Sequence, residues 1–216
     1  HCESMVFQNT ACIRLHNDEA ELVISVGVGP RVLSFRRHGG VNFMKIFGDQ
    51  FNAPNPGEWH SYGGHRLWHA PECFPRTYYP DNEPVEYSFA DGVLTLRGAA
   101  ETTTGLQKEI TVKLAESGTR VELGHRIYNR NSWEVEFAPW CLTVMAPGGR
   151  ALIPQEPYVP HGSGPGESFA PARPLVLWQF TRMNDPRFGW GDRLIAMRED
   201  GRFESKQKIG MTNRTG

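Results

Sequence analysis

The stretch GLQKEITVKLAESGTRVELGHRIYNR, residues 105–130, decides the fold class, because its side chains alternate between apolar and polar with a period of two. Its first half places Leu106, Ile110 and Val112 on one side, with polar residues between them. Successive side chains of a strand point to opposite faces, so this is the pattern of a half-buried strand. Small and polar residues at 116–118 supply a turn, and the stretch therefore predicts a β-hairpin.

The same period continues in other parts of the chain, and no stretch shows sustained helical spacing. Residues 84–98 carry Asp91-Gly92 at their centre, a strong signal for a hairpin turn. Sixteen prolines and 23 glycines are spread between the apolar runs, as an architecture with many turns requires. Further strand regions are predicted at 20–27, 31–37, 133–149, 175–180 and 192–200. We therefore expect an all-β sandwich or barrel.

The bulk properties exclude some classes of partner. The net charge of −1 argues against nucleic acid or an anionic membrane as the main partner. No run of eighteen apolar residues exists, so we expect no membrane-spanning segment. The glycine patterns that cradle phosphates or dinucleotides are absent, and no cofactor is expected. The oligomeric state stays open.

The chain is long enough for one large domain, which we expect to cover residues 1–216. It opens with His1 rather than methionine, so the lack of a signal peptide leaves the compartment open between periplasmic or secreted and cytoplasmic. Residues 154–174 are rich in proline and glycine and are predicted to form a loop bordering a site. The last residues, 206–216, stop without a closing turn, which predicts a chain that is incomplete at its C-terminus.

The stretch SYGGHRLWHAPE, residues 61–72, carries the chemistry. If its centre is a strand, His65 and His69 lie on one face, within about 7 Å of each other. That spacing suits a shared ligand or metal ion, but no third ligand stands at a fixed spacing, and the four cysteines form no C-x-x-C pair. We therefore predict no metal site. The alternative is that only one histidine faces a site.

Arg66 and Trp68 alternate with the two histidines and indicate a second use. Sugars are recognised by planar polar groups that bond pairs of hydroxyls and by aromatic faces that cover apolar C–H patches. An arginine supplies the fork and a tryptophan supplies the platform. Tyr62 adds aromatic surface, and the Gly63-Gly64 pair allows a close backbone approach or a bend. Aromatic residues at this density are equally typical of a sandwich core.

Four segments together resemble an uncharacterised bacterial branch of the galactose mutarotase-like superfamily. They are GPRVLSFRRHGGVNFMK (29–45), GGHRLWHAPE (63–72), YYPDNEPV (78–85) and FAPWCLTVMAPGG (137–149). The resemblance extends from about residue 11 to 216. It implies a large twisted β-supersandwich, here truncated at the C-terminus, with carbohydrate bound on the concave face of one sheet.

The aldose 1-epimerases of that superfamily open and close a sugar ring with a carboxylate base and a histidine acid. Their substrate arginine matches Arg66. Where they have a first histidine, this chain offers Asp81 and Asn82, and where they have the acid histidine it offers Trp140 and Thr143. Their base glutamate falls beyond Gly216. The resemblance therefore implies a sugar site in which some catalytic groups are replaced.

Other residues complete the candidate set. His65 or His69 is a candidate for a relocated acid, because both lie beside Arg66 in the sequence. Glu72 is either the base of such a pair or a partner of a nearby arginine. His125 points either into the concave face or into the core. With Trp68, Tyr62, Trp140 and Thr143 as ligand contacts, we expect a carbohydrate-binding protein with aldose 1-epimerase-like activity. The alternatives are a non-catalytic sugar-binding module and a domain associated with a polysaccharide lyase or hydrolase.

Overall fold

The structure is a computed structural model that describes residues 1–52, 55, 57–162, 164 and 170–212. Its regular elements are antiparallel β-strands and two short 3-10 helices, η1 (Gly48–Phe51) and η2 (Arg76–Tyr78). The described residues contain no α-helix, which confirms the all-β class expected from the period-two pattern. None of their helices is long and apolar enough to cross a membrane. The residues 163 and 165–169 of the expected 154–174 loop lie outside the described part.

The chain divides into two compact units, His1–Ala146 and Pro147–Gly216, and each is described by itself. The single domain expected over 1–216 stays a prediction.

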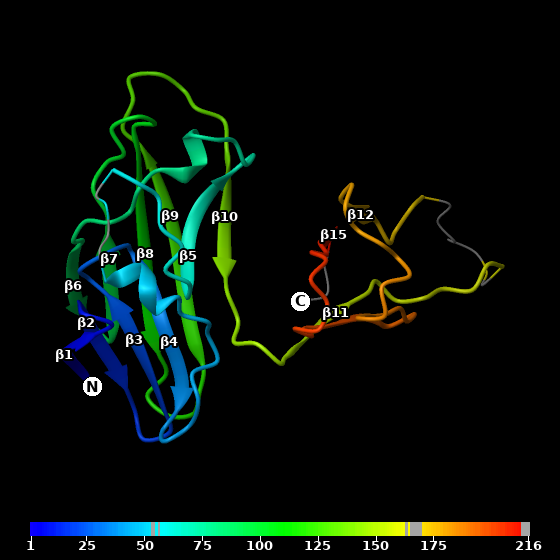
Figure 1. Cartoon of the computed structure of the whole chain (residues 1–216), viewed down its shortest axis with the longest axis horizontal. Helices are drawn as coiled ribbons and strands as arrows, with labels where there is room; N and C mark the ends of the chain where they lie inside the picture. Colours follow the sequence, from blue (N-terminus) through cyan, green and yellow to red (C-terminus); the bar gives the residue numbers. More distant parts are fainter. Residues whose placement is uncertain (53–54, 56, 163, 165–169, 213–216) are drawn as a thin grey trace. The chain divides into compact units, whose positions relative to one another are not determined.

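The first unit is a sandwich of two antiparallel sheets (Figure 1). One sheet has six strands in the order β1-β2-β3-β4-β5-β10, and the other has four in the order β6-β7-β8-β9. The six strands are β1 (Cys2–Phe7), β2 (Thr10–His16), β3 (Ala20–Ser25), β4 (Arg31–Arg37), β5 (His65–Ala70) and β10 (Ala138–Thr143). The four strands are β6 (Glu86–Ala90), β7 (Val93–Arg97), β8 (Leu106–Leu114) and β9 (Val121–Asn129).

The main hydrophobic core lies between these sheets. Ile24 of β3, Val32 of β4 and Leu67 of β5 pack with Leu94 of β7 and Ile110 of β8, all almost fully buried. Burying each such side chain contributes about 1.5–3 kcal/mol relative to leaving it exposed.

The hairpin 105–130 forms as predicted, with β8 and β9 paired from end to end. Its alternating apolar residues face the other sheet.

A second, smaller core covers the opposite face of the six-stranded sheet. Val23 and Leu33 point away from the main core and pack with Phe51 and Tyr62 from the segment that precedes β5. The Phe51 and Tyr62 ring centroids lie 4.6 Å apart. The sheet is thus apolar on both faces in its middle, and β5 begins where the covering segment ends.

The Gly63-Gly64 pair makes the bend into β5. Both residues have positive φ, +84° and +67°, a region that favours glycine. A Cβ on Gly63 would lie 2.1 Å from the carbonyl oxygen of Lys45, and one on Gly64 would lie 2.1 Å from that of Val32. From the sequence, the glycine pair is expected either to allow a close backbone approach or to bend the strand. These contacts explain the bend.

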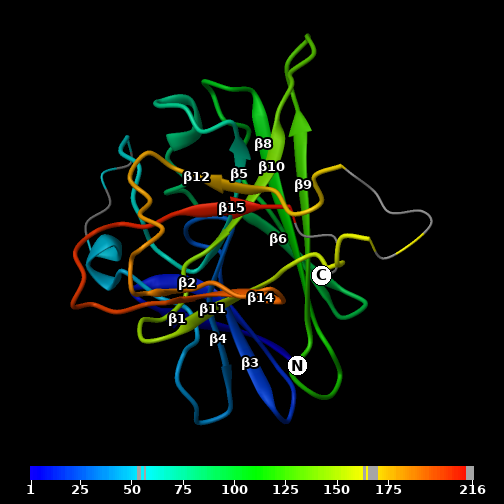
Figure 2. The ribbon, with the colours of Figure 1, turned by 90° about the vertical axis from the view of Figure 1, so that its right-hand side faces the viewer.

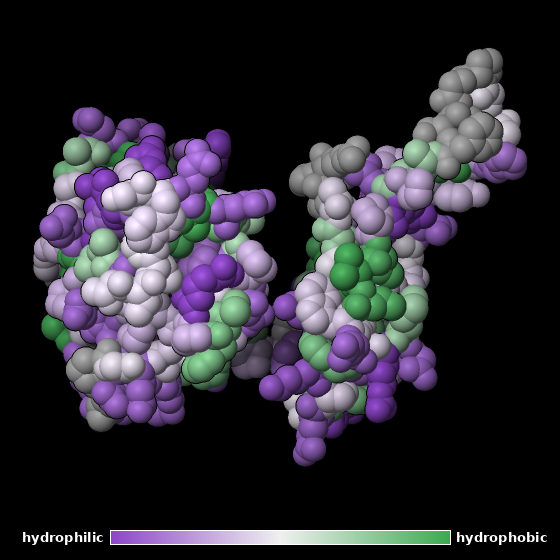
Figure 3. Space-filling view, turned by 90° about the horizontal axis from the view of Figure 1, so that it is seen from above, coloured by the Kyte–Doolittle hydropathy of each residue, from purple (hydrophilic) through white to green (hydrophobic). Residues whose placement is uncertain are grey.

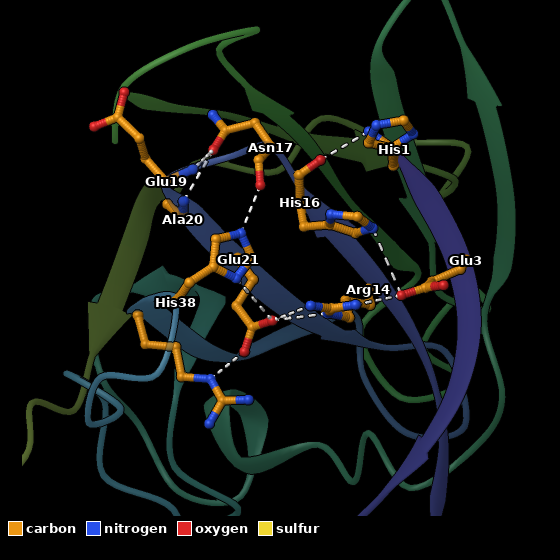
Figure 4. A network of polar contacts seen from close by, with 10 residues as sticks. His1, Glu3, Arg14, His16, Asn17, Glu19, Ala20, Glu21 and His38 are labelled. Carbon is orange, nitrogen blue, oxygen red and sulfur yellow. Dashed lines mark hydrogen bonds and ion pairs between the residues drawn. The ribbon is translucent and has the colours of Figure 1, made fainter.

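A polar network ties the first four strands together (Figure 4). Glu21 on β3 is almost fully buried and accepts hydrogen bonds from Arg14 on β2 and Arg36 on β4. Burial raises the pKa of Glu21, but its hydrogen bonds to the two arginines outweigh burial, and the net pKa is lowered. Glu21 therefore stays ionised and pairs both neighbouring strands.

The second unit has two small antiparallel sheets, β11-β14-β13 and β12-β15 (Figure 2). Its strands are β11 (Arg150–Pro154), β12 (Leu175–Leu177), β13 (Phe188–Gly189), β14 (Leu194–Arg198) and β15 (Ile209–Met211). Several large apolar side chains of this unit are exposed, among them Leu152 at 60% and Val176 at 53%. Figure 3 shows apolar side chains gathered on the surface of this unit.

We expect Gly64→Ala to destabilise the protein more than Gly92→Ala. Gly92 also has positive φ, +75°, but a Cβ there meets nothing within 4 Å. Both variants carry the backbone strain of about 1–3 kcal/mol, and only Gly64→Ala adds a clash with backbone. Urea unfolding measures the two free energies. Equal losses would mean that the close approach to Val32 does not hold β5 in place.

Candidate functional site

Strand β5 separates the predicted site residues onto two faces. It pairs with β4 through Arg31 and Val32 and with β10 along its whole length. Leu67 lies in the main core between the sheets, whereas the guanidinium of Arg66 lies over the ring of Trp68 on the opposite face. His65 and His69 share the face of Leu67, as the period-two pattern predicts.

An aromatic cluster covers the outer face of β5. The Trp68 ring centroid lies 5.7 Å from that of Trp59, 5.0 Å from that of Tyr78 and 5.6 Å from that of Trp140. Trp59 and Tyr78 meet edge to face at 5.2 Å. Trp140 comes from β10, where it stands opposite Trp68 in the register of the pair. Trp68 is only 4% exposed, so it supports the cluster from below rather than presenting a free face.

Arg66 lies on this cluster and forms no ion pair with any residue that the structure describes. Its guanidinium carbon is 3.9 Å from the ring centroid of Trp68 and 5.1 Å from that of Trp59. Its Nε is buried and makes no hydrogen bond within the described part of the chain. Burial, and then the charge of Arg31, lower the pKa of Arg66 to about 10. The side chain therefore remains protonated at neutral pH.

The neighbouring arginine has the partner that Arg66 lacks. Arg31 stands opposite Arg66 in the register of β4 and β5 and is fully buried. It forms an ion pair with Asp81, donates to the carbonyl oxygen of Gly63 at 3.2 Å and lies over the Tyr62 ring. Asp81, predicted as a ligand contact, is thus placed in an ion pair. The sequence gives no sign of this partnership, because Asp81 belongs to a distant loop, whose backbone carbonyl at Asp81 accepts a hydrogen bond from Gly29 just before β4.

A surface pocket of about 690 Å³ opens beside the cluster. Its walls carry four aromatic residues, two prolines, two threonines, a glycine, an acid and an arginine: Gly57, Glu58, Trp59, Phe74, Pro75, Arg76, Tyr78, Tyr79, Pro80, Thr103 and Thr104. Trp59 and Tyr78 belong both to the pocket wall and to the cluster that holds Arg66. Mostly apolar concave sites with a few polar groups are typical of small-ligand binding.

Glu72 reaches this pocket through Tyr78. The Tyr78 hydroxyl donates a hydrogen bond to Glu72 Oε1 at 2.5 Å. This hydrogen bond, followed by burial, raises the pKa of Tyr78. Tyr78 of this hydrogen-bonded pair lines the pocket, and Glu72 lies behind it.

Two predicted ligand contacts have structural positions instead. Tyr62 is fully buried, so it presents no surface to a ligand, and its hydroxyl donates to Asn82 Oδ1 at 2.7 Å. Asn82 donates in turn to the carbonyl oxygens of Asn55 and Glu58, at 3.1 and 2.6 Å. These bonds fix the segment that carries Trp59 beside the pocket. Aromatic density alone did not distinguish a wall of the site from the packing behind it.

The inner face of β5 holds a pair of imidazoles. His65 Nε2 lies 2.7 Å from Nε2 of His125 on β9, and His65 Nδ1 lies 2.8 Å from the hydroxyl of Thr143 on β10. Burial lowers the pKa of His65 to about 4, with smaller contributions from His125 and Arg31. Burial also lowers the pKa of His125. Of the two positions expected for His125, the structure places it facing the core between the sheets.

His69 is separate from this pair. It is 1% exposed, its ring lies 6.4 Å from that of Phe137, and neither ring nitrogen makes a hydrogen bond to a described residue. A proton from His65 or His69 would have to cross the sheet to reach a ligand held by Arg66. His65 and His69 therefore lie on the face opposite Arg66, because neighbours in the sequence of a strand are on opposite faces, and a relocated histidine acid stays a prediction. Within the described residues, no cluster of three or more His, Cys, Asp or Glu is arranged to hold a metal ion.

The comparisons with known proteins are sparse. No family model matches the chain, and no curated protein matches it. Among solved structures, the 4-alpha-glucanotransferase from Thermococcus litoralis is similar over 70% of this chain and 26% of its own, with 14% identity and a TM-score of 0.37. This chain thus spans about a quarter of that protein's length. A likeness of that strength carries no argument about function.

We expect stability to fall as the pH drops from about 6.5 to about 4. The folded pKa of His65 lies below its unfolded value, so the unfolded chain binds more protons in this range. A pKa lowered from 6.5 to about 4 corresponds to a loss of at most about 3 kcal/mol. Urea unfolding at several pH values measures it. His125→Gln should flatten this part of the profile, and His161→Gln, in the second unit, should leave it unchanged; the reverse result would contradict the assignment.

Proposed function

We propose that the protein binds carbohydrate in the pocket on the outer face of β5. The observation that carries the proposal is Arg66: a half-buried guanidinium that lies on Trp68 and Trp59, without a protein partner in the described residues, beside an aromatic pocket. Fixed guanidinium groups bond pairs of oxygen atoms in one plane, as a sugar ring presents them. Trp59 and Tyr78 supply aromatic surface for the C–H face of the ring.

The resemblance of 63–72 and 137–149 to the galactose mutarotase-like superfamily supports the same class of ligand. Its substrate arginine matches Arg66, the residue on which the geometry converges. The replaced histidine positions, by contrast, carry Asp81, which is paired with Arg31, and Thr143, which is bonded to His65. The support therefore extends to binding more directly than to catalysis.

Trp59→Ala should weaken sugar binding by about tenfold, which corresponds to about 1.4 kcal/mol of lost contact with the ring. Titration calorimetry with a panel of mono- and oligosaccharides measures the affinity. Trp133→Ala is the matched control, because Trp133 belongs to the same unit, is 67% exposed and does not line the pocket. Unchanged binding by Trp59→Ala, or equal weakening by both variants, would place the ligand elsewhere.

Aldose 1-epimerase-like activity is the second candidate, favoured by the hydrogen bond between Glu72 and Tyr78, a residue of the pocket wall. Ring opening needs a base that takes the proton from the anomeric hydroxyl and an acid that protonates the ring oxygen as the C–O bond breaks. Glu72 supplies the carboxylate. Tyr78, whose pKa is raised, keeps its proton at neutral pH. Once Glu72 has taken the anomeric proton, the Tyr78 hydroxyl turns from Glu72 and protonates the ring oxygen, and the protonated Glu72 then returns a proton to the phenolate.

Glu72→Gln should reduce anomer interconversion by at least about 100-fold while sugar affinity changes little. Proton NMR of freshly dissolved aldoses follows the rate, and Glu58→Gln, at the acid that lines the pocket, serves as control. A wild-type protein that binds sugar and does not accelerate interconversion is a non-catalytic binding module. The polysaccharide lyase or hydrolase alternative has no observation in its favour.

A further inference from the structure

We infer that the carbohydrate bound here is acidic, and that its carboxylate pairs with Arg66. This inference rests on the proposed function and names the class of sugar. It starts from the two arginines that stand opposite each other on the outer face of β4 and β5, Arg31 and Arg66. Like charges directly opposite each other in a sheet are destabilising unless something neutralises them.

The protein supplies a carboxylate for only one of the two charges. Asp81 forms an ion pair with Arg31. Glu72, the next acid nearby, accepts the Tyr78 hydroxyl and forms no ion pair with Arg66 within 4 Å. Asp81 and Glu72 favour the charged form of Arg66 from a distance, but among the described residues neither forms an ion pair with it.

Other arginines of the chain show what such a group ordinarily has. Arg14 is paired with Glu3 and Glu21, Arg97 with Glu109, and Arg187 with Asp185. Taking a charged group out of water is costly unless the charge is paired and hydrogen-bonded. A neutral sugar hydroxyl would give Arg66 a hydrogen bond but no counter-charge. An anionic group gives both.

The shape of the guanidinium group favours one kind of anion. The pocket beside Arg66 carries one further arginine, Arg76, and one acid, Glu58, which offset each other. Arg76 also donates to the carbonyl oxygen of Pro71. A carboxylate carries one charge, whereas a phosphate monoester carries about 1.5 to 2 at neutral pH. The planar fork of Arg66 matches a carboxylate in a bidentate arrangement, so a uronic acid residue fits the site.

The test compares sugars that differ only in this carboxylate. Titration calorimetry of the wild-type chain uses the methyl glycosides of glucuronate and galacturonate, their neutral glucoside and galactoside counterparts, glucose 6-phosphate and sodium acetate. We expect at least one uronide to bind at least tenfold more tightly than its neutral counterpart. This preference should shrink as the salt concentration rises, because a partly exposed ion pair is screened.

Variants test whether Arg66 causes the preference for a uronide over its neutral counterpart. Arg66→Gln should remove it, and Arg66→Lys should keep part of it, since lysine keeps the charge but loses the fork. Arg126→Gln is the matched control: Arg126 also lies over an aromatic ring, 5.9 Å from the centroid of Tyr128, but it forms an ion pair with Glu109 and does not line the pocket. It should leave the preference unchanged.

The outcomes separate this inference from the proposed function. Equal affinity for uronide and neutral glycoside overturns the inference and leaves carbohydrate binding intact. Tighter binding of glucose 6-phosphate overturns the carboxylate in favour of a phosphate. Acetate bound as tightly as the uronide, or no binding of any glycoside, overturns the proposed function as well.

Discussion

The alternation of side chains along β5 is the constraint on which the site depends. The strand lies between two hydrophobic cores, with Leu67 turned into the larger one and Arg66 turned onto an aromatic surface. A shift of one residue would bury the arginine and expose the leucine, so register is strongly specified. Two backbone contacts enforce it, because Gly63 and Gly64 approach the neighbouring carbonyls too closely for any side chain. The register of β5 therefore positions both the core residue Leu67 and the candidate site residue Arg66.

Much of the first unit could be predicted from the sequence because its signals are local. Asp91-Gly92 and the apolar alternation of 105–130 specify their hairpins within the segments themselves. The prediction missed β1 and β2, in which charged and small residues interrupt the apolar pattern. It also extended the strand at 133–149 well beyond β10, which covers only Ala138–Thr143. Short strands such as β13 and β15 have too few residues for a period to show.

The candidate site was predictable in kind and less so in detail. Arg66 beside Trp68 marked a binding surface, and the structure adds Trp59, Tyr78 and a pocket to it. What the sequence could not show is which distant residues share a face. The pairing of Arg31 with Asp81 depends on tertiary structure, and so does the contact of His65 with His125 across the sandwich. In both contacts, a polar residue that the sequence suggests for ligand binding is held by another residue of the protein.

The contact between His65 and His125 has a consequence for where protons sit. Two neutral imidazoles whose Nε2 atoms are 2.7 Å apart hold one hydrogen between them, so they must be opposite tautomers. If His65 accepts, its other nitrogen donates to Thr143; if His65 donates, the Thr143 hydroxyl must turn round and donate to it. The orientation of one hydroxyl on β10 therefore reports which of the two sheets carries the shared proton.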